Sequence, residues 1–342
     1  MTKQFSAIKL MFRGPLALMS EKKDEFKPEI THIPSDTLKA ALVSALGFMG
    51  DEKNVKKLNE NLIVSSAYPY LNDIFFFPRP RIQMHFSGVP EDPGFRKKIK
   101  RIAFLDRDLF EKVINGEEIS FDNIIMLHNG KFWLKKHENL NINTDTKIYA
   151  VQSAGRVQIG NLNVFSESEK GDPYYVSRTY FKRNDDKEHM VSGLYFIYHT
   201  DDEQPLEKAL NILKDEGLGS DRKFGNGHFE WEKVNLQLNI PENPAGYVLL
   251  SRYIPGQNEI ANNMLKTSSF ELALSSGYIS GTVKEGFAHW LRKNIWMIEA
   301  GSVLNTSEDL KGKQVVVSTD EMEKALGHQV FRDGRAITIG YK

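Results

Sequence analysis

The pattern of apolar and polar residues predicts four strands in the first two thirds of the chain. Near the start, Ile8 and Leu10 fall on one side of an extended chain and Lys9 on the other, as in a half-buried strand. Later segments are compact and rich in aromatic or β-branched residues, which favours strands over helices. The predicted strands cover residues 5–14, 71–77, 193–199 and 228–240, the last as one strand or a pair.

Two other segments repeat their apolar residues at helical spacing. In residues 35–47, leucines and alanines recur every three or four positions after Ser35, a residue type suited to capping a helix. Residues 205–216 show a similar stripe, with a proline near the start and a glycine just past the end. Both segments are therefore predicted to be amphipathic helices, and a short third helix is expected at residues 106–115.

The order of these elements indicates an α+β fold. A strand, a helix and a strand precede a long excursion, and a second strand, helix and strand follow it, which is the pattern of ferredoxin-like and RRM-like domains. We therefore predict a first domain at residues 1–240, with an insertion at about residues 79–150 that projects from the core like a thumb.

A second α+β domain is predicted at residues 241–342. Pro241, Pro244 and Gly246 mark a hinge before it. We expect a second ferredoxin-like unit of mostly strands, although no sequence repeat links the two halves. Its segments are residues 247–254, 258–265, 269–279, 294–299, 314–318 and 336–339.

Composition excludes several classes of protein. The 342 residues include no cysteine, which rules out disulfides, zinc ribbons, iron–sulfur clusters and thiol catalysis. Residues 1–14 lack the pattern of a signal peptide, and the longest apolar run, residues 74–78, is far shorter than the roughly 20 residues of a membrane-spanning helix. We expect a cytoplasmic protein that does not associate with a membrane.

The charge is balanced overall but locally uneven. Lys and Arg number 45, as do Asp and Glu, so any site for a polyanion has to be local. Residues 79–107 are the most basic window, with eight Lys or Arg against three acidic residues, an excess of +5. This window is either a solvated basic face or a surface that contacts RNA phosphates without reading sequence.

A glycine-rich loop at residues 217–227 joins the end of a predicted helix to the start of a strand. Its four glycines allow positive φ and can gather backbone N–H groups into a concavity that suits a phosphate, while Arg222 and Lys223 add positive charge. It is neither a Walker A loop nor a dinucleotide fingerprint. The residues alone leave two interpretations open, a phosphate site and an elaborate turn that ends the helix.

This loop resembles the signature G-[IL]-G-G-x-R-x-x-G-x-G of the RAMP superfamily of CRISPR proteins, with Ser220 in place of the second glycine of the pair. Further segments are similar to the type III-A, or Csm, effector subunit that caps the 5′ end of the guide RNA. They are PSDTL at residues 34–38, SSAYPY at 65–70, FPRP at 77–80, WMIEAGSV at 296–303 and GHQVFRDGRA at 327–336. In the last motif, Asp333 stands where an aromatic residue is usual, which is expected to weaken the local packing.

The resemblance implies a non-catalytic subunit without metal or cofactor. It would grip the 5′ handle of the crRNA, dock to the large polymerase-like subunit, stack on the repeated backbone RAMP subunit and meet target RNA through the complex. The residues implied to bind RNA are Ser35, Asp36, Arg156, Gly217, Gly219, Ser220, Asp221, Arg222, Lys223, Phe224, Gly225, Gly227, Gly301, Ser302, His328 and Arg332. For Ser35 and Asp36, capping of the helix is an equally simple explanation.

Two alternatives remain open from the sequence. One is a metal-independent endoribonuclease that processes precursor crRNA, for which His32 is the candidate, although no partner base or orienting carboxylate is evident near it in the sequence. The other is the equivalent subunit of another type III complex.

An acidic stretch also has two explanations. Asp185, Asp186 and Glu188, with residues 201–203, flank a predicted core strand. They are either a docking surface for the large subunit or a solvated charge run.

Overall fold

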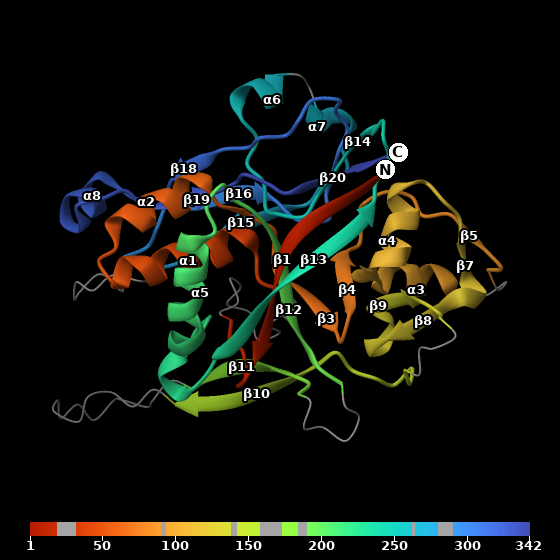
Figure 1. Cartoon of the computed structure of the whole chain (residues 1–342), viewed down its shortest axis with the longest axis horizontal. Coiled ribbons are helices and arrows are strands. Elements are labelled where there is room, and N and C mark those ends of the chain that lie inside the picture. Colours follow the sequence, from red (N-terminus) through yellow and green to blue (C-terminus); the bar gives the residue numbers. More distant parts are fainter. Residues whose placement is uncertain are drawn as a thin grey trace.

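The computed structural model describes residues 1–18, 32–89, 94–137, 142–157, 173–183, 190–261, 264–279 and 290–342. Its centre is one long sheet in which the strands lie in the order β13-β1-β12-β3-β4-β6-β9-β8, and β2 (Ile63–Val64) adds a short pairing to β12 (Figure 1). Within this described part of the chain, no helix has the length and apolar character needed to cross a membrane.

Four strands of this sheet form the first unit. They are β1 (Thr2–Phe12), β3 (Tyr68–Leu71), β12 (Ser192–His199) and β13 (Phe229–Asn239), all antiparallel to their neighbours. Helices α1 (Ser35–Phe48) and α2 (Glu52–Asn61) lie between β1 and β3 in the chain, and α5 (Gln204–Glu216) lies between β12 and β13. The elements thus follow the predicted β-α-β-β-α-β order, with α2 as an additional helix.

Apolar residues cover both faces of these strands. Ile8 and Leu10 pack with Leu42 of α1 and Leu210 of α5 on one face. On the other face, Ala7 belongs to a larger cluster of buried apolar residues. Burial on both faces explains why β12, the central strand, is almost continuously apolar rather than alternating.

The predicted strand at residues 71–77 is two strands. Leu71 ends β3 and Ile74 begins β4 (Ile74–Pro78), so Asn72 and Asp73 form a tight turn between them. Asn72 has a φ of 53°, a conformation that asparagine tolerates better than most residues. The aromatic run that follows hid this turn in the sequence pattern.

The insertion at residues 79–150 was predicted to project from the core, and the structure corrects this. Its strands β6 (Phe104–Asp106), β8 (Ile124–Leu127) and β9 (Phe132–Lys135) extend the central sheet beyond β4. Buried aromatic residues such as Phe104 and Trp133 explain the difference, because a projecting segment would leave them in water. The remaining elements are β5 (Phe86–Ser87), α3 (Phe95–Arg101), α4 (Arg107–Ile114), β7 (Ile119–Ser120) and the 3₁₀ turns η1 (Phe121–Asn123) and η2 (His128–Gly130).

A separate two-stranded ribbon leaves this sheet, formed by β10 (Tyr149–Val157) and β11 (Pro173–Phe181). The predicted boundary at residue 150 therefore falls inside β10. An isolated bridge between Leu16 and Thr179 joins the ribbon to the segment after β1, and Figure 1 shows β10 and β11 near the lower end of α5.

The C-terminal unit consists of small sheets and short helices. A three-stranded sheet has the order β17-β14-β20, from β14 (Gly246–Leu249), β17 (Val303–Leu304) and β20 (Thr338–Tyr341), and a bridge between Ser269 and Val303 extends it. Two strand pairs accompany it, β15 (Leu272–Ser275) with β16 (Ile295–Ile298) and β18 (Gln314–Val316) with β19 (Phe331–Asp333).

The helices of this unit differ from the predicted run of strands. Residues 258–265 lie mainly in α6 (Gln257–Ala261) and α7 (Met264–Thr267), and α8 (Asp320–Leu326) was not predicted. Helix α8 begins at Thr319, whose side chain accepts the backbone N–H of Met322. It is too short to show a helical apolar stripe in the sequence.

The two units are not separate bodies. One cluster of buried residues includes Ala7 and Leu236 from the first unit together with Val248 and Ile339 from the second. The chain ends also lie together (Figure 1), and the N-terminal amino group of Met1 donates a hydrogen bond to the Ile240 carbonyl at 2.7 Å. A shared core fixes the orientation of one unit relative to the other.

Candidate functional site

The glycine-rich loop follows α5 and begins the return to β13. Gly217, Gly219, Gly225 and Gly227 all have positive φ, as does Asp221, and residues 222–224 form a single 3₁₀ turn, η3 (Arg222–Phe224). At Gly227, φ is +77° and a Cβ would lie 1.9 Å from the Leu218 carbonyl oxygen, so glycine is required there by both conformation and space.

The loop uses much of its backbone to hold itself against the segment after β1. The N–H of Leu218 donates to the Gly227 carbonyl at 2.9 Å, the N–H of Gly227 donates to Pro15 at 2.8 Å, and the N–H of Ser220 donates to Ala17 at 2.8 Å. These three groups are therefore not part of the predicted phosphate nest. Their role is to fold the loop, and Ser220, which replaces a glycine of the family pattern, makes this bond without difficulty.

The outward surface of the loop is provided by side chains. Lys223 is exposed, Arg222 is half-buried, and the Phe224 ring is 68% exposed, an unusual position for a large apolar side chain. Two cations beside an exposed ring are suited to a phosphate and to stacking against a base. The Leu16–Thr179 bridge places the β10–β11 ribbon next to the segment on which this loop rests.

Ser35 and Asp36 lie elsewhere, at the junction of the two units. Ser35 Oγ accepts the backbone N–H of Arg252 at 2.9 Å, and Asp36 is only 2% exposed. The Asp36 carboxylate lies 3.4 Å from Arg252 Nη1 and accepts a hydrogen bond from the Ser275 hydroxyl at 2.8 Å. Both side chains are turned inward, so the geometry favours a structural role over contact with RNA.

The buried network continues to Glu299 and His32. Arg252 Nε donates to Glu299 Oε2 at 3.0 Å, and His32 Nε2 lies 3.9 Å from Glu299 Oε1. Burial alone would raise the pKa of Glu299, but the nearby His32 ring and the charge of Arg252 outweigh it and lower the pKa to about 2. His32 thus has the orienting carboxylate that the sequence did not reveal.

The other predicted residues of the C-terminal unit divide in a similar way. Arg332 Nε lies 3.7 Å from Asp36, so Arg332 belongs to the buried network. Ser302 is fully buried and its Oγ accepts the Glu271 N–H at 3.1 Å, whereas His328 is exposed. Gly301 has φ +82° and a Cβ there would lie 2.9 Å from the Arg79 carbonyl oxygen. The structure therefore separates these residues from the glycine-rich loop.

Asp333 pairs with Lys39, a buried lysine that sequence analysis did not single out. Both Lys39 Nζ and the Arg335 guanidinium contact the Asp333 carboxylate, with Arg335 Nη2 at 2.7 Å. Burial lowers the pKa of Lys39 to about 8, although the charge of Asp333 opposes this shift. The departure from the family pattern at Asp333 thus replaces aromatic packing by an ion pair between α1 and β19.

The structure says less about Arg156 and the acidic stretch. The Arg156 backbone pairs with Tyr174 in the ribbon, but its side chain lies outside the described residues, as do Asp185, Asp186 and Glu188. Asp202 pairs with Lys57 at 2.9 Å, and Glu203 pairs with Lys233 at 2.5 Å. Asp202 and Glu203 are therefore engaged with side chains of the same molecule, and Asp201 is exposed.

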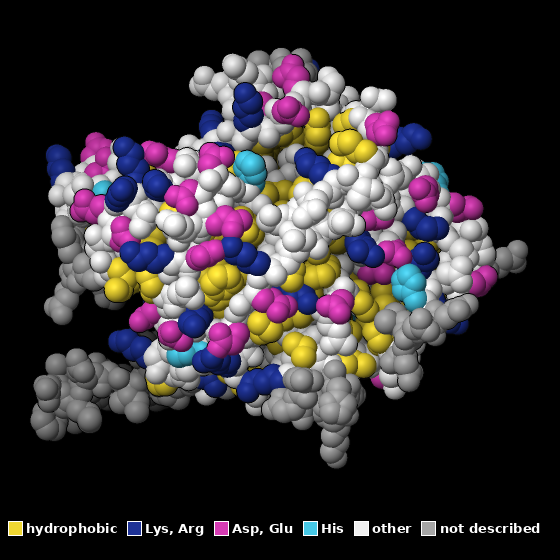
Figure 2. Space-filling model, viewed as in Figure 1, with side chains coloured by type: hydrophobic (Ala, Val, Ile, Leu, Met, Phe, Trp, Pro, Cys, Tyr) yellow, Lys and Arg dark blue, Asp and Glu magenta, His cyan; other side chains and the backbone are white. Residues whose placement is uncertain are grey.

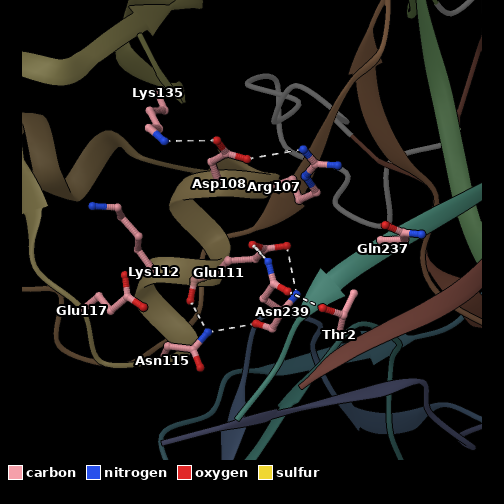
Figure 3. A pocket seen from close by; sticks show the side chains of 10 residues that line it. All are labelled: Thr2, Arg107, Asp108, Glu111, Lys112, Asn115, Glu117, Lys135, Gln237 and Asn239. Carbon is pink, nitrogen blue, oxygen red and sulfur yellow. Dashed lines mark hydrogen bonds and ion pairs between the residues drawn. The ribbon is translucent and has the colours of Figure 1, made fainter. Parts of the chain in front are cut away.

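A polar pocket of about 620 Å³ lies between α4 and the edge formed by β1 and β13 (Figure 3). Its charges pair with one another: Asp108 contacts Arg107 and Lys135, and Glu111 accepts hydrogen bonds from Asn239. Opposite charges are also interspersed over the molecular face in Figure 2. Neither feature indicates a site for a strongly charged ligand.

Sequence comparison relates this chain to Csm4 proteins. Residues 242–341 match the model of the CRISPR Csm4 C-terminal domain. A Csm4 protein of Thermococcus onnurineus (strain NA1) is 20% identical over 98% of this chain and 96% of its own length, and one of Methanocaldococcus jannaschii is 23% identical over 85% and 84%. Both relatives that resemble most of this chain are thus Csm4 proteins, and its C-terminal unit matches the Csm4 family model.

Solved Csm4 structures have the same mixed α+β fold. The Csm3-Csm4 subcomplex of a type III-A CRISPR-Cas interference complex contains a chain that matches with a TM-score of 0.62 at 18% identity, covering 99% of this chain and 100% of that one. A Csm1-Csm4 cassette in complex with cA4 matches with a TM-score of 0.60 at 19% identity, covering 99% and 98%. The likeness in fold extends over both units of this chain.

Proposed function

We propose that this Csm4 chain is the non-catalytic subunit of a type III-A complex that grips the 5′ handle of the crRNA. The observation that carries this proposal is the outward surface of the glycine-rich loop, where Arg222, Lys223 and Phe224 combine positive charge with an exposed ring. Phosphate contacts would supply affinity, and Phe224 would stack on an unpaired base. The similarity to Csm4 proteins supports this function, although the loop backbone is largely used in folding.

The same proposal includes protein partners. Two of the similar solved structures hold Csm4 with Csm1 and with Csm3. We therefore expect this chain to anchor the large polymerase-like subunit and to stack on the repeated backbone subunit, with target RNA meeting the assembled complex. Co-expression with each subunit from the same organism, followed by size-exclusion chromatography, tests the two contacts separately.

Both units are best described as ferredoxin-like domains within this proposal, with a boundary near residue 240. The first unit supports this through its strand order β13-β1-β12-β3 and the placement of its helices between strands. In the second unit, the order β20-β14-β17 followed by the bridge at Ser269 gives the corresponding arrangement in a shorter form.

The RNA-binding role is tested with the double variant Arg222→Ala, Lys223→Ala. Its affinity for handle RNA should fall by more than about tenfold, or 1.4 kcal/mol. The matched control is Lys53→Ala, Lys56→Ala, which removes two cations from the exposed side of α2. Equal affinities of the two folded double variants would contradict the role of the loop.

The endoribonuclease alternative is favoured by one observation, the placement of Glu299 beside His32. Cleavage without a metal needs a general acid as well as a general base near the scissile phosphate. Incubation of the purified chain with precursor RNA in EDTA distinguishes the two functions. Cleavage that disappears in His32→Ala would replace the non-catalytic proposal, whereas intact RNA supports it.

A further inference from the structure

Three asparagines of this chain are directly followed by glycine: Asn115, Asn129 and Asn226. In such a pair, the backbone nitrogen of the glycine can attack the side-chain carbonyl carbon of the asparagine, because glycine has no Cβ to hinder the approach. The reaction needs an amide side chain that is free to turn and a glycine N–H that is free to leave its own hydrogen bond. The folded chain meets these conditions differently at the three pairs.

Asn115, at the end of α4, is held by its side chain. Its Nδ2 donates to the Glu111 carbonyl at 2.8 Å and to the Asn239 carbonyl at 2.9 Å (Figure 3). The N–H of Gly116 donates to the Val113 carbonyl at 3.2 Å. Both reacting groups are therefore engaged, and the side chain has to break two hydrogen bonds before it can turn toward the backbone.

Asn226 belongs to the glycine-rich loop and is protected by burial. It is only 1% exposed, and the N–H of Gly227 donates to the Pro15 carbonyl at 2.8 Å. The backbone is so closely packed here that a Cβ at Gly227 would lie 1.9 Å from the Leu218 carbonyl oxygen. The contacts that fold the loop thus also keep this pair from reacting.

Asn129 lies in the turn between β8 and β9, and its side chain is exposed. Within the described part of the chain, its amide makes no hydrogen bond. The turn is strained, because His128 and Asn129 have φ of 52° and 58°, a left-handed conformation that residues other than glycine adopt at a cost. It is closed by a long hydrogen bond from the Lys131 N–H to the His128 carbonyl, at 3.3 Å. A strained turn at the surface opens at little cost in free energy.

We propose that Asn129 is a site of spontaneous deamidation in the folded protein, with water as the co-reactant. The Gly130 nitrogen forms a bond to Asn129 Cγ and loses its proton, and the side-chain nitrogen leaves as ammonia, which gives a cyclic succinimide. Water then adds across one of the ring C–N bonds. Opening at the side-chain carbonyl gives aspartate, and opening at the backbone carbonyl gives isoaspartate. No atom is oxidised or reduced, and the site does not depend on the proposed function.

The two products should affect the structure differently. Aspartate tolerates the left-handed conformation much as asparagine does, so the turn should persist with one added negative charge. Isoaspartate lengthens the main chain by one methylene between Leu127 and Phe132, which pair across the β8–β9 hairpin. It should therefore loosen this end of the central sheet, while the glycine-rich loop stays unmodified.

The test incubates the full chain in mildly alkaline buffer, once folded and once unfolded in guanidinium chloride. Mass spectrometry of Glu-C peptides follows each asparagine over time, and cleavage after Glu117 separates Asn115 from Asn129. In the unfolded chain the three pairs should convert at similar rates, because each has the same neighbour. In the folded chain Asn129 should convert at least about tenfold faster than Asn115 or Asn226, which corresponds to about 1.4 kcal/mol. Tryptophan fluorescence verifies that the aged sample is still folded.

The matched control is Asn129→Gln, which keeps the amide on a longer side chain that cyclises far more slowly. On ion exchange, aged wild type should gain an acidic form that elutes with Asn129→Asp, and aged Asn129→Gln should not. Three results would overturn the proposal: equal rates at the three pairs in the folded chain, fastest conversion at Asn115 or Asn226, or an unchanged Asn129 in a folded sample under conditions in which the unfolded chain reacts.

Discussion

Removing the guanidinium of Arg252 should destabilise the protein far more than removing an exposed one. Arg252 is only 6% exposed and lies between the carboxylates of Asp36 and Glu299, at 3.4 and 3.0 Å. The change Arg252→Met keeps an unbranched side chain and the backbone N–H that binds Ser35, so the main loss is the charge. Asp36 and Glu299 would then remain buried without their shared cation.

The size of the expected stability loss follows from the burial of these charges. Breaking a buried ion pair by removing one partner costs about 3–5 kcal/mol, because the remaining charge cannot be solvated. Ser275 and Arg332 still face Asp36 and His32 still faces Glu299, which places the expected loss near the lower end, at about 3 kcal/mol. The matched control is Arg13→Met, which breaks an ion pair with Glu230 at the surface and should cost less than about 1 kcal/mol.

Urea unfolding followed by tryptophan fluorescence measures both variants. Because the two units share one core, we expect a single transition whose midpoint falls strongly in Arg252→Met and little in Arg13→Met. Equal shifts of the two midpoints would refute the reasoning, since the network would then contribute no more than a surface pair. A loss of RNA affinity without a loss of stability would instead return Asp36 and its partners to the RNA site.

Three further predictions concern the same junction and the loop. The pKa of Glu299 is lowered from 4.5 to about 2, so ionised Glu299 contributes about 3 kcal/mol to the free energy of unfolding, and this contribution should be lost as pH falls through this range. In acid unfolding experiments, Glu299→Gln should not show this pH-dependent loss of stability. The pKa of Lys39 is lowered from 10.5 to about 8, so the free energy of unfolding should rise between these pH values in wild type, and urea midpoints of Lys39→Met should lack that rise. The Cβ added by Gly225→Ala meets no atom within 4 Å, so this variant should lose only about 1–2 kcal/mol of unfolding free energy, because of its positive φ. Gly227→Ala should lose clearly more, because its Cβ would clash with the Leu218 carbonyl oxygen. Thermal unfolding of both variants measures the difference.

Much of the first unit is predictable because its elements are long and their patterns are regular. Residues 35–47 and 205–216 were predicted as helices and form α1 and α5 almost to the residue. Short elements carry too few residues to show a period, which is why the sequence predicted neither α8 nor the turn at Asn72 that separates β3 from β4. The extension of the sheet by the insertion depends on pairing between strands far apart in the chain, and no local pattern contains that information.

The candidate site was less predictable, because a motif does not state which atoms face water. The glycines of residues 217–227 indicated a loop with positive φ, and the structure has it. The direction of its N–H groups depends on Pro15 and Ala17, some 200 residues earlier. Similarly, nothing in the helical pattern around Lys39 indicates that its side chain is buried against Asp333.

The segments that resemble the family motifs meet mostly in one place. Ser66 Oγ accepts the N–H of Ser35 at 3.1 Å, and the Tyr68 hydroxyl donates to the Leu250 carbonyl at 2.6 Å, so the motifs at residues 34–38 and 65–70 hold each other and the C-terminal unit. Glu299, from the motif at residues 296–303, joins the same junction through Arg252.

The motif at residues 327–336 acts on the end of α2. Arg335 donates to the Asn59 carbonyl at 2.8 Å and Lys39 donates to the Leu62 carbonyl at 2.6 Å, which supplies cations where the carbonyl groups of a helix lack partners. These motifs therefore fix the angle between the two units. A rigid junction keeps the C-terminal unit in a fixed position relative to the unit that carries the glycine-rich loop. A substitution that loosens the junction should consequently lower the stability of the protein, and any change in RNA binding should accompany that loss of stability.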